Sequence, residues 1–174
     1  MWKCIRLLAS ILIAAMPGLF VSGGVQPVAA QEPEWQEFQS IPTNGARDGE
    51  FFTIGSNHYL AMANQYNDST YNVASKLYRW DANFVEFQSI ATNGACDWEF
   101  FTIGSDHYLA VANEYNGSTH NLDSKFYRWD GISFVAFQSI PTNGGRDWEF
   151  FTIGSDHYLA IASFWCKTSL IASR

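Results

Sequence analysis

The chain has 174 residues, a formal net charge of −7 at neutral pH, and aromatic side chains at 17% of its positions. The acidic balance disfavours nucleic acid and anionic lipid surfaces as partners. The aromatic content argues for one domain with a dense apolar core and against disorder.

The first thirty residues predict a secretory signal peptide. Lys3 and Arg6 give a basic start, an apolar run follows over residues 7–21, and small residues end the segment at Ala30. The run is shorter than the about 20 residues that cross a bilayer, so we expect cleavage after Ala30, export and no membrane span. This cleavage removes Lys3 and Arg6, so the chain that follows has eight basic and seventeen acidic side chains and a formal charge of −9.

One sequence block occurs three times. Residues 97–112 match residues 147–162 at fifteen of sixteen positions and residues 48–63 at thirteen of sixteen. A period near 50 residues indicates a repeat architecture. The predicted organisation is repeat one over residues 31–83, repeat two over 84–133, a partial third repeat over 134–162 and a divergent tail over 163–174.

Each full repeat contains four short runs with strand character. In the second repeat these are residues 84–90, 98–103, 107–113 and 125–130. Asn93-Gly94 and Gly104-Ser105 supply turns between them. Apolar side chains alternate onto both faces of the strands and no segment has helical spacing, so the sheets must cover one another.

Four strands per repeat in tandem predict an all-β fold, a partial β-propeller of about three four-stranded blades with the third blade incomplete. A β-sandwich is the alternative, although it usually leaves one polar face on each sheet.

The second repeat carries the pattern F-x-x-F-Q-S-I-x-T-N-G-A-x-D-W-E-F-F-x-I-G-S-x-x-Y-L-A-V-A-N over Phe84–Asn113, and Y-R-W-D over Tyr127–Asp130. This pattern resembles the EAR (epilepsy-associated), or epitempin, repeat. The resemblance covers nearly all of the chain after the signal segment. It implies a secreted or cell-surface protein, repeats that build seven-bladed propellers, and a non-enzymatic role in binding other proteins.

The third repeat stops matching after Ala162, and the tail over residues 163–174 has no Y-R-W-D strand. Three blades are fewer than the about four to eight that close a propeller ring. Two explanations stay open. The chain is a truncated or frameshifted copy of a longer protein, or it is a protomer that completes a ring by homo-oligomerisation.

Three carboxylate pairs recur with the repeat: Asp48 and Glu50, Asp97 and Glu99, and Asp147 and Glu149. Residues two apart on a strand point to the same side, so each pair could offer oxygens to Ca²⁺. We favour a structural role instead, in which the aspartate caps the preceding turn and the glutamate faces solvent or pairs with an arginine. No metal is predicted.

The motifs of hydrolases and nucleotide-binding enzymes are missing from the sequence, which has no G-x-S-x-G, no H-E-x-x-H and no phosphate-binding glycine loop. We therefore predict no enzymatic activity and no cofactor. His58, His107 and His157 recur with the repeat, which suggests packing, while the isolated His120 is expected to be exposed.

Four residues near the turn between the first and second strands are candidates for binding: Arg47, Trp98, Arg146 and Trp148. Tryptophan and arginine are favoured at binding hot spots. The alternative is that the tryptophans pack between blades, since the first repeat has Gly49 at that position. Cys96 has no cysteine counterpart in the other repeats, so we expect it to be unpaired, with a bridge to Cys166 left open.

In an up-and-down blade, the turns at Asn44, Asn93 and Asn143 share a rim with the loops at Asn67 and Asn116. We predict a secreted, non-enzymatic binding module that serves protein–protein interaction or surface adhesion, with rim loops that contact a protein partner or surface receptor. A glycan-binding propeller is the first alternative, and a non-functional fragment of a longer EAR-repeat protein is the second.

Overall fold

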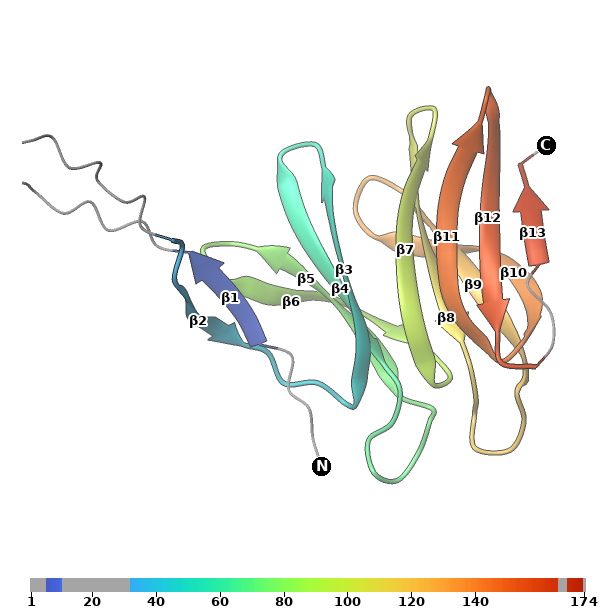
Figure 1. Ribbon diagram of the computed structural model, residues 1–174, viewed down its shortest axis with the longest axis horizontal. Coiled ribbons are helices and arrows are strands. Elements are labelled where there is room, and N and C mark those ends of the chain that lie inside the picture. Colours follow the sequence, from blue (N-terminus) through green and yellow to red (C-terminus); the bar gives the residue numbers. More distant parts are fainter. Residues whose placement is uncertain (1–5, 11–31, 166–168, 174) are drawn as a thin grey trace, which may run out of the picture. The chain divides into compact units, whose positions relative to one another are not determined.

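The computed structural model describes residues 6–10, 32–165 and 169–173, which form thirteen strands and no helix (Figure 1). Within that part of the chain there is accordingly no helix that could span a membrane. The all-β prediction is confirmed.

The strands form four antiparallel sheets. A two-stranded sheet pairs β1 (Arg6–Ser10) with β2 (Trp35–Ser40). The other three sheets are the blades: blade 1 is β3 (Ala46–Ile54), β4 (Asn57–Asn64), β5 (Ala74–Trp80) and β6 (Phe84–Ala91); blade 2 is β7 (Ala95–Ile103), β8 (Asp106–Asn113), β9 (Asn121–Trp129) and β10 (Phe134–Asn143); blade 3 is β11 (Gly145–Ile153), β12 (Asp156–Ser163) and β13 (Ser169–Ala172).

Residues 5–41, with β1 and β2, are a compact unit separate from residues 42–174, which hold the blades. β1 belongs to the predicted signal segment and pairs with β2 from Arg6↔Ser40 to Ser10↔Trp35. The remainder of that segment and Cys166 lie outside the described residues, so signal cleavage and the Cys96–Cys166 bridge stay predictions.

The first two strands of every blade form the same hairpin. Ile54 pairs with Asn57, Ile103 with Asp106 and Ile153 with Asp156. The turn glycines of these hairpins have φ of 61°, 64° and 64°, a left-handed conformation that glycine adopts at no steric cost. The hairpin tips lie together at one end of the blades (Figure 1).

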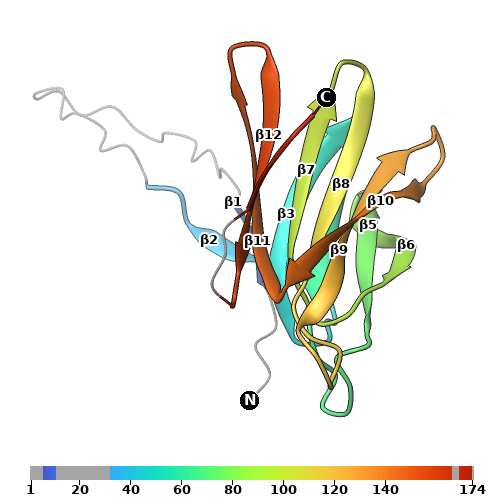
Figure 2. The same ribbon diagram turned by 90° about the vertical axis from the view of Figure 1, so that its right-hand side faces the viewer.

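The blades cover each other's apolar faces. β7 contacts both β3 and β11, which places blade 2 between the other two (Figure 1). Figure 2 shows the same blades from the side of blade 3. Phe52 stacks on Phe100 with ring centroids 4.4 Å apart, and Phe101 stacks on Phe150 at 4.9 Å. One buried cluster fills each of the two gaps between blades. This is a partial propeller whose sheets do not close into a ring, and the sandwich alternative is wrong.

Blade 3 has three strands within the described residues, as the prediction of an incomplete third blade required. β13 nevertheless forms in the divergent tail. It holds the register of the third strand, because Tyr158 pairs with Ala172 as Tyr108 pairs with Arg128. The pairing therefore depends on backbone geometry more than on the missing Y-R-W-D side chains.

Candidate functional site

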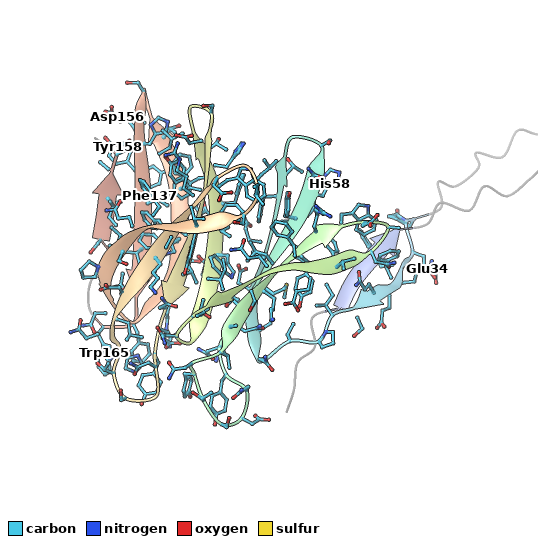
Figure 3. All side chains as sticks on the ribbon, turned by 180° about the vertical axis from the view of Figure 1, so that it is seen from behind. Glu34, His58, Phe137, Asp156, Tyr158 and Trp165 are labelled. Carbon is cyan, nitrogen blue, oxygen red and sulfur yellow. The ribbon has the colours of Figure 1, made fainter. Side chains whose placement is uncertain are left out.

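The predicted rim forms at the end of the blades opposite the hairpin tips. Figure 3 shows Trp165 at this end, while His58 and Asp156 lie at the hairpin end. We call the rim the segments 44–45, 65–72, 93–94, 114–120, 143–144 and 164–165. Backbone hydrogen bonds join them, among them Gly94 N to Tyr71 O at 2.6 Å and Gly144 N to His120 O at 2.7 Å.

In blades 1 and 2 a buried asparagine at the end of the second strand holds the loop in place. Asn113 accepts the N–H of Asn93 at 3.0 Å and donates its amide to the Asp123 carbonyl at 2.8 Å. Asn64 makes the same two bonds in blade 1. Because buried amides are costly to leave unpaired, these bonds fix the turns against the loops.

A polar cluster lines a cavity of about 250 Å³ on the rim; its residues are Arg47, Gln65, Cys96, Glu114 and Arg146. Arg47 Nε donates to Gln65 Oε1 at 2.7 Å, and Gln65 Nε2 donates to Glu114 Oε2 at 2.7 Å. Arg146 Nη2 lies 2.5 Å from Glu114 Oε1. The cluster therefore connects all three blades through side chains.

Glu114 is the electrostatic centre of the cluster and is only 7% exposed. Burial opposes its ionisation, but hydrogen bonds from Cys96 and Arg146 and the Arg146 charge lower its pKa below the usual value. Burial, followed by the Glu114 carboxylate, raises the pKa of Cys96 to about 12. Cys96 is therefore a neutral thiol that donates to Glu114 at 3.1 Å, and it has no nucleophilic character.

A row of aromatic rings runs along the rim beside this cluster, formed by Tyr66, Tyr71, Tyr115, His120, Phe164 and Trp165. Neighbouring ring centroids are 4.5 to 5.7 Å apart. Phe164 and Trp165 are 47% and 52% exposed, and Arg146 lies over the Phe164 ring at 4.3 Å. The row and the polar cluster thus form one continuous surface.

His120 is a member of this row, so the prediction that it is simply exposed was wrong. Its ring is half-buried between Tyr115 and Phe164, and Nδ1 lies 2.9 Å from the Glu114 carbonyl oxygen. The recurring histidines pack as predicted. Each stacks on the first phenylalanine of its own hairpin, as His107 does on Phe100.

The structure separates the four predicted binding residues into two pairs. Arg47 and Arg146 are exposed and line the rim cavity. Trp98 and Trp148 are 1% and 2% exposed and belong to the buried clusters between blades. A partner on the surface has no access to these two indoles, so the arginines alone remain candidates for direct contact.

Sequence reasoning missed Gln65, Glu114 and the aromatic row. Their signal is variation between repeats: Gln65, Glu114 and Phe164 occupy one repeat position, and the neighbouring position holds Tyr66, Tyr115 and Trp165. The surrounding strands hardly vary. Substitution confined to one short loop of near-identical repeats therefore points to a surface that each blade shapes differently.

The repeated carboxylates bind the next blade, a role that neither sequence interpretation included. Asp97 accepts the Trp148 N–H at 2.7 Å, and Glu99 accepts the Phe150 N–H at 2.8 Å. Asp48 and Glu50 accept the N–H groups of Trp98 and Phe100, both at 3.2 Å. We call these four bonds the carboxylate ladder. Within the described residues no group of three or more acidic, histidine or cysteine side chains is placed to hold a metal.

Burial raises the pKa of Asp97 from the ordinary value of an aspartate to about 8, although the hydrogen bond from the Trp148 N–H opposes this rise. Between these values the folded state binds more protons than the unfolded state, so stability must fall as pH rises. We expect the free energy of unfolding to drop by on the order of 2 kcal/mol from about pH 5 to about pH 8. Glu99, whose pKa burial raises to about 7, contributes to this drop, and Asp97→Asn should remove the Asp97 share and leave a shallower decline.

Urea denaturation across this pH range measures the effect. The exposed Asp123→Asn is the control, because it removes the same charge outside the ladder. An equally steep decline in Asp97→Asn and in the native chain would contradict the assignment.

Comparison with known proteins gives one family and two relatives. The EPTP domain model matches three times, over residues 36–81, 83–130 and 133–172, and the third match includes β13, beyond the predicted repeat end at Ala162. The mouse protein named thrombospondin-type laminin G domain and EAR repeat-containing protein is 48% identical over 44 residues, and its human counterpart is 43% identical over 44. Each match covers 25% of this chain and 7% of the relative.

Proposed function

The chain belongs to the EPTP domain family of EAR repeats, and we propose that it is a non-enzymatic protein-binding module whose partner docks on the rim. The observation that carries the proposal is the continuous rim surface, in which exposed aromatic side chains adjoin two exposed arginines. Aromatic and arginine side chains are enriched among the residues that dominate binding energy.

The charge at the rim suggests what the partner offers. The chain is acidic overall, at −7, yet its rim cavity presents Arg47 and Arg146 around a single carboxylate. Glu114 neutralises Arg146, and Arg47 bonds only an uncharged amide in the described chain. An acidic side chain of the partner, flanked by apolar residues that contact Phe164 and Trp165, complements this surface.

A glycan is the second candidate, since aromatic rings can stack on sugars. The arrangement of the row favours a protein. The rings of Tyr66, Tyr71, Tyr115 and His120 contact one another, which leaves Trp165 as the ring best placed to stack on a sugar. In this proposal the module acts outside the cell, because its first thirty residues have the composition of a secretory signal.

Charge reversal at Arg47 tests the proposal. Arg47→Glu removes the cation while leaving the aromatic row in place, so affinity for the partner is expected to fall about tenfold or more. Lys125→Glu is the matched control, because it makes the same charge change in the middle of β9. The partner is first isolated by a photo-crosslinker placed at position 165 and compared with one placed at Thr53 on β3.

A glycan array probed in parallel separates the alternatives. Protein captured from position 165 but not from position 53, and lost in Arg47→Glu, supports the proposal. Equal binding by Arg47→Glu and Lys125→Glu would contradict it. Binding to glycans alone would favour the lectin alternative, and binding to neither would favour a non-functional fragment.

A further inference from the structure

Two asparagines of the rim lie in the sequence pattern that marks acceptors for N-linked glycans in secreted proteins. The pattern is asparagine, then any residue except proline, then serine or threonine. Residues 67–69 are Asn-Asp-Ser and residues 116–118 are Asn-Gly-Ser, at the same position of repeats one and two. No other asparagine of the chain has serine or threonine two residues after it. The pattern is therefore confined to the two loops of the rim.

Both asparagines begin the same tight turn. Asn67 Oδ1 accepts the N–H groups of Ser69 and Thr70, at 3.3 and 3.0 Å, and Asn116 accepts the two equivalent groups in blade 2. Backbone N–H groups only donate, so the oxygen of each side-chain amide must face the turn. The nitrogen of that amide, Nδ2, then points away from the turn, and within the described residues it makes no hydrogen bond.

A third turn of this kind shows what the turn itself needs. Asp130 Oδ1 accepts the N–H groups of Ile132 and Ser133, both at 2.8 Å. The Asp130 N–H donates to the Ser133 carbonyl, just as the Asn67 N–H donates to the Thr70 carbonyl. Here the first residue is a carboxylate, which is the stronger acceptor, and the third residue has no hydroxyl. The turn alone therefore requires neither an amide nor a serine.

The amide and the serine are the two groups that the acceptor pattern demands. Ser69 Oγ donates to Asn67 Oδ1 at 2.9 Å, and Ser118 Oγ donates to Asn116 Oδ1 at the same distance. In each loop the hydroxyl thus contacts the amide that receives the glycan. The features that distinguish these two turns from the turn at Asp130 are accounted for by glycosylation and not by the backbone geometry.

Both amides are accessible. Asn67 and Asn116 are partly exposed, and the two residues that follow each of them are exposed. A Cβ added at Gly117 would meet nothing within 4 Å, so open space lies beside that loop. Figure 1 shows the two loops extending from the blades between β4 and β5 and between β8 and β9. A glycan on either asparagine can extend into solvent.

The buried asparagines of the same loops have the opposite arrangement. Asn64 Nδ2 donates to the Ala74 carbonyl at 2.9 Å, and Asn113 Nδ2 donates to the Asp123 carbonyl at 2.8 Å. These two nitrogens are already used to hold the fold together, whereas the nitrogens of Asn67 and Asn116 are not. Each loop therefore contains one structural asparagine and one whose amide nitrogen is free to be modified.

We propose that Asn67 and Asn116 are acceptors for N-linked glycans. The proposal rests on the export that the proposed function includes, because the modification belongs to secreted proteins. An oligosaccharyltransferase supplies the glycan from a polyprenyl diphosphate oligosaccharide. A bond forms between Nδ2 and C1 of the first sugar, and the bond from C1 to the diphosphate oxygen breaks. The lipid diphosphate leaves with that electron pair, and a base of the transferase takes the Nδ2 proton.

The two glycans divide the rim. Each acceptor directly follows a ring of the aromatic row, Tyr66 in blade 1 and Tyr115 in blade 2. At the equivalent position of the third repeat the sequence has Cys166 after Trp165, which offers no acceptor. Glycans therefore shield the loops of blades 1 and 2 and leave the exposed Phe164 and Trp165 to the partner.

Mass measurement of the full chain secreted by cultured animal cells tests the proposal. Treatment with peptide-N-glycosidase F is expected to remove two glycans from the wild-type chain and to leave aspartate at positions 67 and 116. Asn67→Asp and Asn116→Asp should each lose one glycan, and the double variant should carry none. These variants keep the turn, since Asp130 already builds it with a carboxylate. Asn121→Gln is the control, an exposed asparagine outside the pattern that should leave both glycans in place.

Ser69→Ala and Ser118→Ala separate the acceptor pattern from the asparagine itself. Each variant keeps the amide and removes only the hydroxyl, so each should lose the glycan of its own loop. Ser69→Thr should keep the glycan, because threonine satisfies the pattern.

A secreted wild-type chain with both asparagines unmodified overturns the proposal, as does a glycan that persists in the double aspartate variant. A glycan at one position only overturns the assignment of the other. A chain that stays inside the cells without glycans contradicts export and this proposal together. A chain that is secreted and glycosylated, but captures no protein through position 165, contradicts the rim proposal alone.

Discussion

Trp98→Ala is expected to lower the free energy of unfolding by about 3–5 kcal/mol, a large part of the stability of a small domain. The indole is 1% exposed in the cluster between blades 1 and 2, and its ring centroid is 6.0 Å from that of Tyr127. Truncation leaves a cavity that the neighbouring strands cannot close. Urea denaturation at fixed pH measures the loss.

The first repeat provides a control for this substitution. Gly49 occupies the Trp98 position there, and the Sδ atom of Met62 lies 3.2 Å from where a Cβ of residue 49 would stand. Met62 is the cross-strand partner of Gly49, as Val111 is of Trp98. Adding Val111→Met to Trp98→Ala should therefore restore about 1 kcal/mol. A further loss of stability in the double variant would show that a methionine at position 111 does not fill the space that the Trp98 indole leaves.

Much of the fold follows from the sequence because its causes are local. Turn glycines such as Gly104 fix the hairpins, and the alternation of Phe100 with Phe101 puts apolar rings on both faces of β7. Both features recur near a 50-residue period, so one correctly predicted blade gives the others. The incomplete third blade followed from the same reasoning.

Contacts between blades could not be predicted in the same way. The Asp97 carboxylate bonds a backbone group 51 residues away, and Glu114 pairs with Arg146 across 32 residues. Such partners are set by how one sheet lies on the next, and near-identical repeats offer the same residue types at every interface. The buried tryptophans were ambiguous for the same reason, since a tryptophan beside a turn serves equally well in a core or on a surface.

Gly94→Ala is expected to destabilise the protein by more than about 3 kcal/mol, because two costs add. Gly94 has φ of +55°, and a left-handed conformation costs a residue with a side chain about 1–2 kcal/mol. An added Cβ would also lie 2.5 Å from the Tyr115 carbonyl oxygen, so the backbone must move. Thermal and urea unfolding both report the loss.

Gly104→Ala separates the two costs. Gly104 has φ of +64°, but nothing lies within 4 Å of an added Cβ, so this variant should lose only about 1–2 kcal/mol. Gly94 also donates to the Tyr71 carbonyl and accepts the Glu114 N–H, so its displacement must disturb the aromatic row and the polar cluster together. Gly94→Ala should therefore weaken partner binding at temperatures where it is still folded, while Gly104→Ala should not. Equal stability losses in the two variants would show that the rim yields to the added methyl group and is not held rigid by this contact.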